Sequence, residues 1–399
     1  MLIKSFYYTI FFIIMGLSII SFTYPSNATN YLDPTYNWHL QEVGIEKAWS
    51  YTQGSKEIVV AVIDSGIDFN HPDLLNQSWV NLGEIPENGK DDDNNGYIDD
   101  VRGWDFRGND NDPSPPYASL PPSNPPAGHY HGTFVAGLIA ADNDADISVG
   151  VAPNISLMNL RFLDENNAFS RYDWGMFTNT INYAVANGAN IIHLSIQACP
   201  SELNPVPPKS FFTAIKKAYE SGVIIVSVTG NIQNCGKTSI HYPGNYSEVI
   251  AVSATTRARE HASFSCTGDQ NEISAPGENI YSIYPNNYSL SLGNGTSFAA
   301  PLVSGTIALM LSLNRYLTVE DIREVLHETS TDLGETGKDP VYGYGLLNAS
   351  AALEKVITKF GINTSMSKTT EGLSFDGGFS IFFLVLFVVL LKINRKGRN

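Results

Sequence analysis

Residues 293–301 read Gly-Asn-Gly-Thr-Ser-Phe-Ala-Ala-Pro, and an apolar run follows from Leu302 to Leu313. Two glycines, a threonine and a serine before small residues and a proline predict a tight turn that feeds a helix, with Ser297 in its first turn. There the hydroxyl lies beside backbone N–H groups that have no partner within the helix. This position suits a nucleophile whose attack creates an oxyanion. Serine is also a common helix cap, so this stretch alone leaves both interpretations open.

Upstream of this stretch, apolar segments rich in β-branched residues alternate with helical patterns. Helical patterns lie over 176–186 and 211–221, and a further one, 318–328, follows the helix of Ser297. Continuous apolar strands separated by helices are typical of a parallel sheet that is buried on both faces. We therefore expect an α/β fold, a three-layer α/β/α sandwich with a mainly parallel central sheet. The expected strands are 58–63, 155–163, 190–196, 223–228 and 249–254.

Polar residues stand at the ends of some of these segments. Asp64 directly follows the expected strand 58–63, and Asn231 lies three residues after the expected strand 223–228. His131 begins an expected helix that is rich in Ala and Gly. Open α/β sheets build their sites at the carboxyl ends of the strands, so we expect Asp64 and Asn231 at one edge of the sheet. Taken alone, Asp64 is equally typical of a turn, and a single histidine is more often structural.

Three motifs around these residues resemble the signatures of one enzyme family. They are Asp64-Ser65-Gly66, His131-Gly132-Thr133-x-Val135-Ala136-Gly137 and Gly295-Thr296-Ser297-x-Ala299-x-Pro301. With the order Asp, His, Ser, the chain is similar to the subtilisin-like serine proteases, or subtilases, from about Asp33 to Lys355. The resemblance implies a subtilisin-like fold and a monomeric serine-type endopeptidase that acts on extended polypeptides.

The chemistry of these residue types agrees with that resemblance. The hydroxyl of Ser297 is a poor nucleophile without a base, and His131 can take its proton and return it to the leaving amine. Asp64 would hold the imidazole tautomer and stabilise the imidazolium. The Asn231 side chain and the Ser297 N–H would bind the oxyanion of the acyl-transfer step. We therefore expect a Ser-His-Asp triad that works through an acyl-enzyme intermediate.

The resemblance also implies walls for the substrate. Residues 161–170 take the place of the family's substrate-pairing edge strand, along which a peptide would add as an extended strand. The family usually has Gly where this chain has Gln197, which leaves the shape of the primary pocket open. The implied substrate-binding residues are Ala168, Phe169 and Ser170 along the edge, and Leu194, Ser195, Ile196, Val228, Thr229 and Gly230 around the pocket.

An acidic stretch at 91–100 reads Asp-Asp-Asp-Asn-Asn-Gly-Tyr-Ile-Asp-Asp. Its first half matches a calcium loop, but Arg102 stands where such a loop has its bidentate acid, so one of the last two aspartates would have to substitute. We predict a structural Ca²⁺ here, with a solvated acidic loop as the alternative. The family resemblance implies a second calcium site. The predicted ligands are Asp91, Asp93, Asn95, the Tyr97 carbonyl and Asp99 or Asp100, and at the second site Asp73 and Asp144.

Composition excludes one class of partner. The 399-residue chain has 24 Lys and Arg against 40 Asp and Glu, a net charge of −16, so nothing offsets repulsion by the phosphates of a nucleic acid. Three cysteines are too few for a disulfide scaffold and predict one bridge and one thiol in an oxidising compartment. Cys199 and Cys235 follow the two implied pocket walls, so we expect them to be the bridged pair.

Both ends of the chain carry targeting patterns. Residues 1–28 combine a basic residue, an apolar run and small residues, the pattern of a cleaved secretory signal, with an uncleaved anchor as the alternative. We expect the peptidase domain over 29–360 and a polar linker over 361–376. The tail, 377–399, has two glycines, a short apolar run and basic residues, and resembles Gly-Gly sorting or transmembrane tails that a membrane sorting protease recognises. We predict export, then anchoring at the cell surface or membrane, or release.

Two other functions are compatible with the same pattern. One is a catalytically silent surface-binding protein on a protease fold, and the other is hydrolysis of non-peptide esters or amides. The intact set of Asp64, His131, Ser297 and Asn231 favours a protease. Because Asp33 already matches the mature start of the family, the resemblance leaves no room for an inhibitory propeptide.

Overall fold

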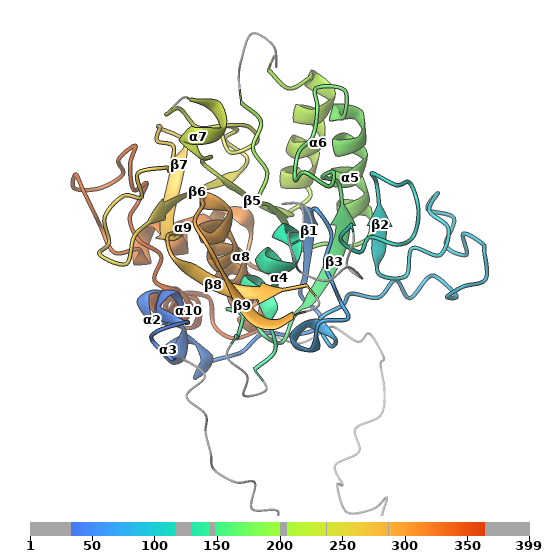
Figure 1. The fold of residues 1–399 in the computed structure, drawn as a ribbon. Helices are drawn as coiled ribbons and strands as arrows, with labels where there is room; N and C mark the ends of the chain where they lie inside the picture. The colour runs from blue at the N-terminus through green and yellow to red at the C-terminus, as the bar shows by residue number, and fades with distance from the viewer. Residues whose placement is uncertain are drawn as a thin grey trace, which may run out of the picture. The chain divides into compact units, whose positions relative to one another are not determined.

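A seven-stranded parallel sheet organises the protein, in the strand order β2-β3-β1-β4-β5-β6-β7 (Figure 1). The structure is a computed structural model and describes residues 33–116, 130–143, 148–199, 206–236, 238–285 and 287–363. The predicted signal and tail lie outside these residues. The sheet strands are β1 Val59–Asp64, β2 Gly103–Asp105, β3 Ser156–Arg161, β4 Ile191–Leu194, β5 Ile224–Val228, β6 Ile250–Thr255 and β7 Asn271–Pro276. An antiparallel pair, β8 Ile280–Tyr284 and β9 Asn287–Gly293, forms a second, smaller sheet.

Helices cover the large sheet on both faces. Side chains of β1 alternate between two cores: Val60 and Val62 pack in the core that includes α4 and α8, whereas Ala61 and Ile63 pack in the core that includes α5 and α6. The predicted α/β/α architecture is therefore confirmed. The helices are α2 Trp38–Glu42, α3 Ile45–Trp49, α4 His131–Ala140, α5 Trp174–Ala186, α6 Lys209–Glu220, α7 Ile232–Cys235, α8 Thr296–Leu313, α9 Val319–Thr329 and α10 Ala349–Phe360, with a 3₁₀ turn, η1, at Pro72–Leu74.

The five predicted strands form, but β2, β7, β8 and β9 were not predicted. Strand β7 shows why, because it is fully buried yet rich in polar residues. Asn271 donates to Ser253 Oγ and to the Val341 carbonyl, and Glu272 pairs with His327. These partners satisfy the polar groups, so the strand is buried without an apolar run in its sequence.

The central helix α8 runs through the core, and all of its residues from Thr296 to Leu313 are buried. Within the described ranges it is also the one helix long and apolar enough to cross a membrane. Its apolar character is therefore explained by core packing. The predicted turn and helix at Ser297 are confirmed.

The strand order places a crevice at the carboxyl end of β1. From β1 the chain passes to β2 and β3 on one side and then crosses to β4 on the other. Loops at such a switch point diverge and leave room for a site between them. Asp64 is the last residue of β1, and Asn231 follows β5 by three positions at the same sheet edge.

Two glycine substitutions test how closely helix α8 packs in the core. A Cβ added at Gly305 would lie 2.5 Å from Val151 Cβ, whereas one added at Gly175 in α5 would meet nothing within 4 Å. We expect Gly305→Ala to lower the free energy of unfolding by about 1–3 kcal/mol, because an overpacked core must shift. Gly175→Ala should leave it unchanged or raise it by up to about 1 kcal/mol. Urea unfolding of both variants measures the difference, and equal stabilities would contradict the close packing of α8.

Candidate active site

A buried carboxylate and an imidazole meet at the end of β1. Nδ1 of His131 lies 2.8 and 3.0 Å from the two carboxylate oxygens of Asp64, and both side chains are buried. The carboxylate also accepts the backbone N–H of Ser65 at 2.7 Å. Because a carboxylate can only accept, Nδ1 carries the proton and Nε2 keeps its lone pair. The imidazole is therefore oriented as a base.

Glycines in the two motifs allow this contact. A Cβ on Gly132 would lie 2.3 Å from the carbonyl oxygen of Gly66, so the start of α4 approaches the end of β1 closely only without a side chain. Gly66 itself has a φ of 104°, in the region that favours glycine. The glycines of both motifs therefore bring His131 to Asp64.

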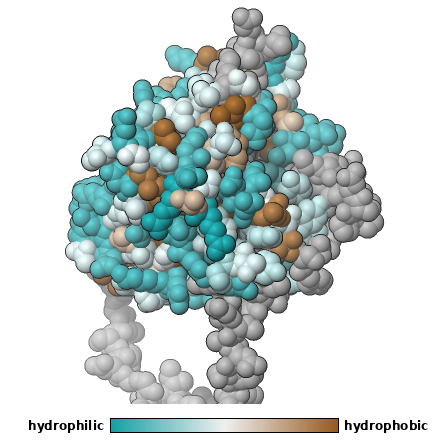
Figure 2. All heavy atoms as spheres, turned by 60° about the vertical axis from the view of Figure 1, so that its left-hand side comes forward, coloured by the Kyte–Doolittle hydropathy of each residue, from teal (hydrophilic) through white to brown (hydrophobic). Residues whose placement is uncertain are grey.

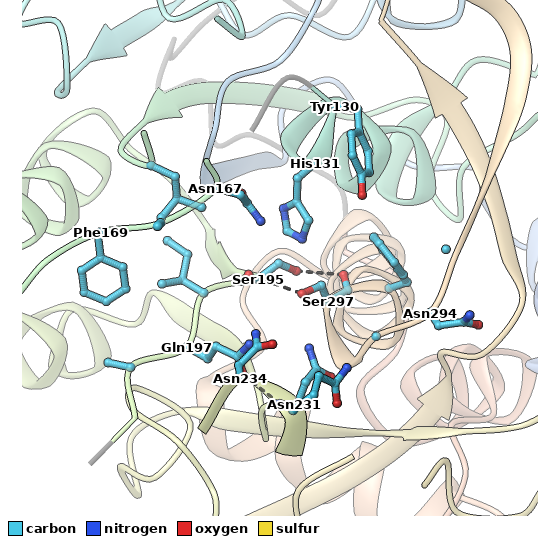
Figure 3. Close-up of a pocket in the computed structure, with 18 of the residues that line it drawn as sticks. Tyr130, His131, Asn167, Phe169, Ser195, Gln197, Asn231, Asn234, Asn294 and Ser297 are labelled. Atoms are coloured by element: carbon cyan, nitrogen blue, oxygen red, sulfur yellow. Dashed lines mark hydrogen bonds between the residues drawn. The ribbon is translucent and has the colours of Figure 1, made fainter. Parts of the chain in front are cut away.

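His131 and Ser297 face each other across the same cleft. Figure 3 shows one ring nitrogen of His131 pointing toward Ser297, and both residues line the cleft. The Ser297 hydroxyl is directed at the carbonyl of Ser195, 3.5 Å away, which is the outer limit of a hydrogen bond. The described side chains of His131 and Ser297 form no hydrogen bond with each other. Contacts of this kind are often long without substrate, and a turn of the hydroxyl about χ1 would bring it toward the imidazole.

Two N–H donors converge beside Ser297. Asn231 Oδ1 accepts the backbone N–H and the hydroxyl of Thr296, at 3.0 and 3.1 Å, which identifies the oxygen and leaves Nδ2 as the outward donor. A Cβ on Gly295 would lie 3.7 Å from both Asn231 Nδ2 and the Ser297 nitrogen. The missing side chain therefore leaves space between two donors, as an oxyanion site requires.

A second histidine, which the sequence did not identify, lies beneath Ser297. His193 is fully buried, with Nε2 2.8 Å from Ser195 Oγ and Nδ1 2.8 Å from Ser304 Oγ. Ser195 donates its only proton to the Ser297 carbonyl at 2.9 Å, so Nε2 of His193 must donate to Ser195 and Nδ1 must accept from Ser304. Burial lowers the pKa of His193 to about 3, and the ring is neutral. This network holds the backbone of Ser297.

The cleft has a volume of about 560 Å³ and is lined by some of the predicted substrate residues. Ala168, Phe169, Ser195 and Ile196 line it, whereas Ser170 does not. Residues 162–170 form a turn rather than an edge strand: the N–H of Asp164 bonds to the Ala168 carbonyl at 3.0 Å, and β3 ends before this turn. The remaining predicted wall residues are buried behind the cleft and do not line it: Leu194, Val228, Thr229 and Gly230.

The acidic loop gathers a different set of carboxylates from the one predicted. Oxygens of Glu84, Asp93 and Asp100 lie within 4.8 Å of one another, and Glu84 and Asp100 are buried. Of these three residues, Asp93 is a predicted ligand and Asp100 is the predicted alternative to Asp99. Glu84 lies outside the motif and was not predicted. The other predicted ligands serve backbone turns here. Asp91 accepts the N–H groups of Asn95 and Gly96, Asn95 Oδ1 accepts that of Tyr97, and Asp99 accepts those of Asn88 and Gly89.

The second predicted calcium site is described only in part. Asp73 is buried and its carbonyl accepts the N–H of Asp142 at 2.8 Å, while Asp144 lies outside the described residues. Of the cysteines, Cys199 is disulfide-bonded and Cys266 is a buried thiol, as the expected pairing requires.

The chain matches one family model and is similar in sequence to known proteases. A family model described as the Subtilase family matches residues 55–345. The minor extracellular protease Epr of Bacillus subtilis (strain 168) is 32% identical over 342 residues, which are 84% of this chain and 45% of Epr. Subtilisin DY of Bacillus licheniformis is 37% identical over 228 residues, 57% of this chain and 78% of that protein. Thermitase of Thermoactinomyces vulgaris is 31% identical over 315 residues, 79% and 94% of the two chains.

The neutral state of His193 predicts a pH dependence of stability. An unfolded histidine titrates near 6.5, so between pH 6.5 and about 3 the unfolded state binds a proton that the folded state excludes. The free energy of unfolding therefore falls as the pH falls, by up to about 1.4 kcal/mol per pH unit for this group. The variant His193→Gln can still donate to Ser195 and accept from Ser304, but it has no group that titrates in this range. We therefore expect its free energy of unfolding, measured in urea, to fall less steeply than that of the wild type between about pH 6 and pH 4.

Parallel declines of the wild type and His193→Gln would contradict the neutral assignment. If the variant is too unstable to measure, the NMR resonance of the His193 C2 proton in the wild-type protein carries the same test. We expect it not to move over this pH range, and a titration near pH 6.5 would overturn the assignment.

Proposed function

Because the chain belongs to the subtilase family, we propose that it is an exported enzyme that cleaves extended polypeptides with Asp64, His131 and Ser297 as its triad. It is a subtilisin-like serine endopeptidase. The observation that carries the proposed roles is the pairing of His131 Nδ1 with Asp64, at 2.8 Å, with the other ring nitrogen turned toward Ser297.

That geometry supports the following reaction. His131 Nε2 takes the proton of Ser297 as Oγ attacks the scissile carbonyl carbon, and Asp64 stabilises the imidazolium that forms. Asn231 Nδ2 and the Ser297 N–H donate to the oxyanion. His131 then gives the proton to the leaving amine, and an acyl group stays on Oγ. Water, deprotonated by the same imidazole, releases the acid and restores the hydroxyl.

The silent-protein alternative is not favoured by the site. A protein that only bound peptides would have no need for a buried, hydrogen-bonded Asp64 or for an Asn231 amide held by Thr296 with its donor outward. The size of the cleft, about 560 Å³, and its open approach support polypeptides over small esters.

Export and anchoring are proposed from the sequence and a relative. One similar protein is named as extracellular, and the predicted signal, residues 1–28, agrees with that location. We propose that the tail, 377–399, is the substrate of a membrane sorting protease or acts as an anchor. On the face seen in Figure 2, apolar residues form small separate patches among polar ones, which supports a monomer.

We propose that Ca²⁺ stabilises the acidic loop. The three carboxylates of Glu84, Asp93 and Asp100 offer only oxygen ligands, the donor set that a hard cation prefers. Two of them are buried, and such close like charges repel one another without a cation. Burial and the neighbouring Asp100 carboxylate raise the pKa of Tyr183, so its hydroxyl stays a donor to Asp100. The residues present therefore fit calcium, which would neutralise this cluster.

An active-site probe tests the proposed nucleophile. We expect a fluorophosphonate to label the wild-type protein stoichiometrically and Ser297→Ala not at all, with the label on Ser297 by peptide mass spectrometry. Labelling elsewhere, or none in a folded wild type, would contradict the proposed roles. Asn231→Leu serves as a matched variant that keeps the triad. Its turnover of peptides should fall roughly a hundred- to a thousandfold, a range known for the corresponding amide of subtilisin itself rather than derived from this geometry.

Chelation tests the calcium proposal through stability. In the Ser297→Ala background, which prevents self-digestion, we expect EDTA to lower Tm by about 5 °C or more relative to millimolar Ca²⁺. Asp100→Asn should remove most of that difference. Asp269→Asn changes an exposed acid outside the cluster and should keep it. A Tm that does not respond to Ca²⁺ in the background protein would refute the site.

A further inference from the structure

Gln197 lies in the cleft at the position where the resemblance expects glycine. It follows β4, is partly buried, and lies next to Asn231 in the cleft that Ser297 also lines (Figure 3). Its Oε1 lies 2.7 Å from the backbone nitrogen of Asn231 and 3.0 Å from Nδ1 of His241. The backbone N–H can only donate, so the atom that it contacts is the oxygen of the carboxamide.

The buried ring of His241 fixes that orientation. Since Oε1 can only accept, Nδ1 of His241 must carry the proton, and Nε2 then faces the thiol of Cys266, 3.6 Å away, as an acceptor. Burial lowers the pKa of His241 to about 4 and raises that of Cys266 to about 11, so both groups are neutral in solution near pH 7. A Cβ on Gly230 would lie 2.2 Å from Nδ1, so the ring packs directly on that glycine.

The remaining end of the carboxamide is therefore a fixed donor. Oε1 is occupied by two N–H groups, and Nε2 of Gln197 donates to no group in the described part of the chain. The residue lines the cleft, so these N–H groups are available to a substrate side chain. A donor held by two buried partners loses little further freedom when it binds.

The other described residues that line the cleft include no acidic side chain and no Lys or Arg. The other amide side chains of the cleft are those of Asn167, Asn231, Gln233, Asn234 and Asn294. A cationic side chain would find no counter-charge here and would meet the positive end of the Gln197 amide dipole. A neutral side chain with an acceptor oxygen would gain a hydrogen bond.

On the basis of the proposed protease function, we infer that Gln197 determines specificity: it selects neutral, acceptor-bearing side chains such as Gln at the cleavage position and disfavours Lys and Arg. The selecting group is the N–H₂ of its carboxamide, oriented by Asn231 and His241. Gln197→Glu tests this, because the carboxylate still accepts both N–H groups but replaces the donor by a negative acceptor.

The experiment compares kcat/KM for three peptides that differ only in the side chain before the scissile bond, Gln, Leu or Lys. In the wild type we expect Gln to be preferred over Lys by about tenfold or more. Gln197→Glu should shift this ratio toward Lys by at least about tenfold. Because the donor of Gln197 can bond to Gln but not to Leu, we also expect the wild type to prefer Gln over Leu, and Gln197→Leu should remove most of that preference. Gln233→Glu adds the same charge at an exposed position of the cleft and should shift the ratio less.

Fluorophosphonate labelling of each variant separates the possible failures. A wild type that neither labels nor cleaves any peptide would refute the proposed function. A labelled, active wild type that prefers Lys, or a labelled Gln197→Glu with an unchanged Gln-to-Lys ratio, would overturn only the role of Gln197. If Gln197→Glu does not fold, the Gln-to-Leu ratio of Gln197→Leu decides the question, and an unchanged ratio overturns the inference.

Discussion

The buried hydrogen bond between the Asp64 carboxylate and the His131 imidazole is the constraint on which the site depends. A carboxylate with an exposed fraction of 1% is costly unless its oxygens are bonded, and here an imidazole N–H and the Ser65 backbone N–H supply the bonds. The same contact selects the tautomer of His131 and directs Nε2 toward Ser297. A single interaction thus bonds the buried carboxylate and orients the imidazole that we propose as the base.

The rest of the fold brings backbones close enough for that contact. The parallel sheet sets the end of β1 at a switch point, and small residues at the start of α4 let it approach. Below the cleft, a neutral His193 joins Ser195 and Ser304 and so fixes the carbonyl of Ser297. The proposed triad is therefore carried by the buried elements β1, α4 and α8, and little rearrangement is expected when substrate binds.

Sequence reasoning identified the residues that stand at the ends of elements and missed those defined by tertiary contact. Asp64, His131, Ser297 and Asn231 stand at or near the ends of strands or the starts of helices, and the resemblance of the motifs around Asp64, His131 and Ser297 to those of one family was enough to propose their roles. His193 sits inside an apolar strand, and its partner Ser304 lies 111 positions away. Glu84 lies before the calcium-like motif in the sequence. The polar residues of β7 are buried because they bond to groups far away in the sequence. Such pairings leave no periodic signal in the chain.

A crystal structure of the protein inhibited by an organophosphonate tests the central claim most directly, since the inhibitor mimics the tetrahedral intermediate. We expect phosphorus bonded to Ser297 Oγ, its oxygen within hydrogen-bond distance of Asn231 Nδ2 and the Ser297 nitrogen, and His131 still paired with Asp64. A phosphonate attached at another residue, or an adduct on Ser297 with Asn231 turned away and His131 separated from Asp64, would contradict the account.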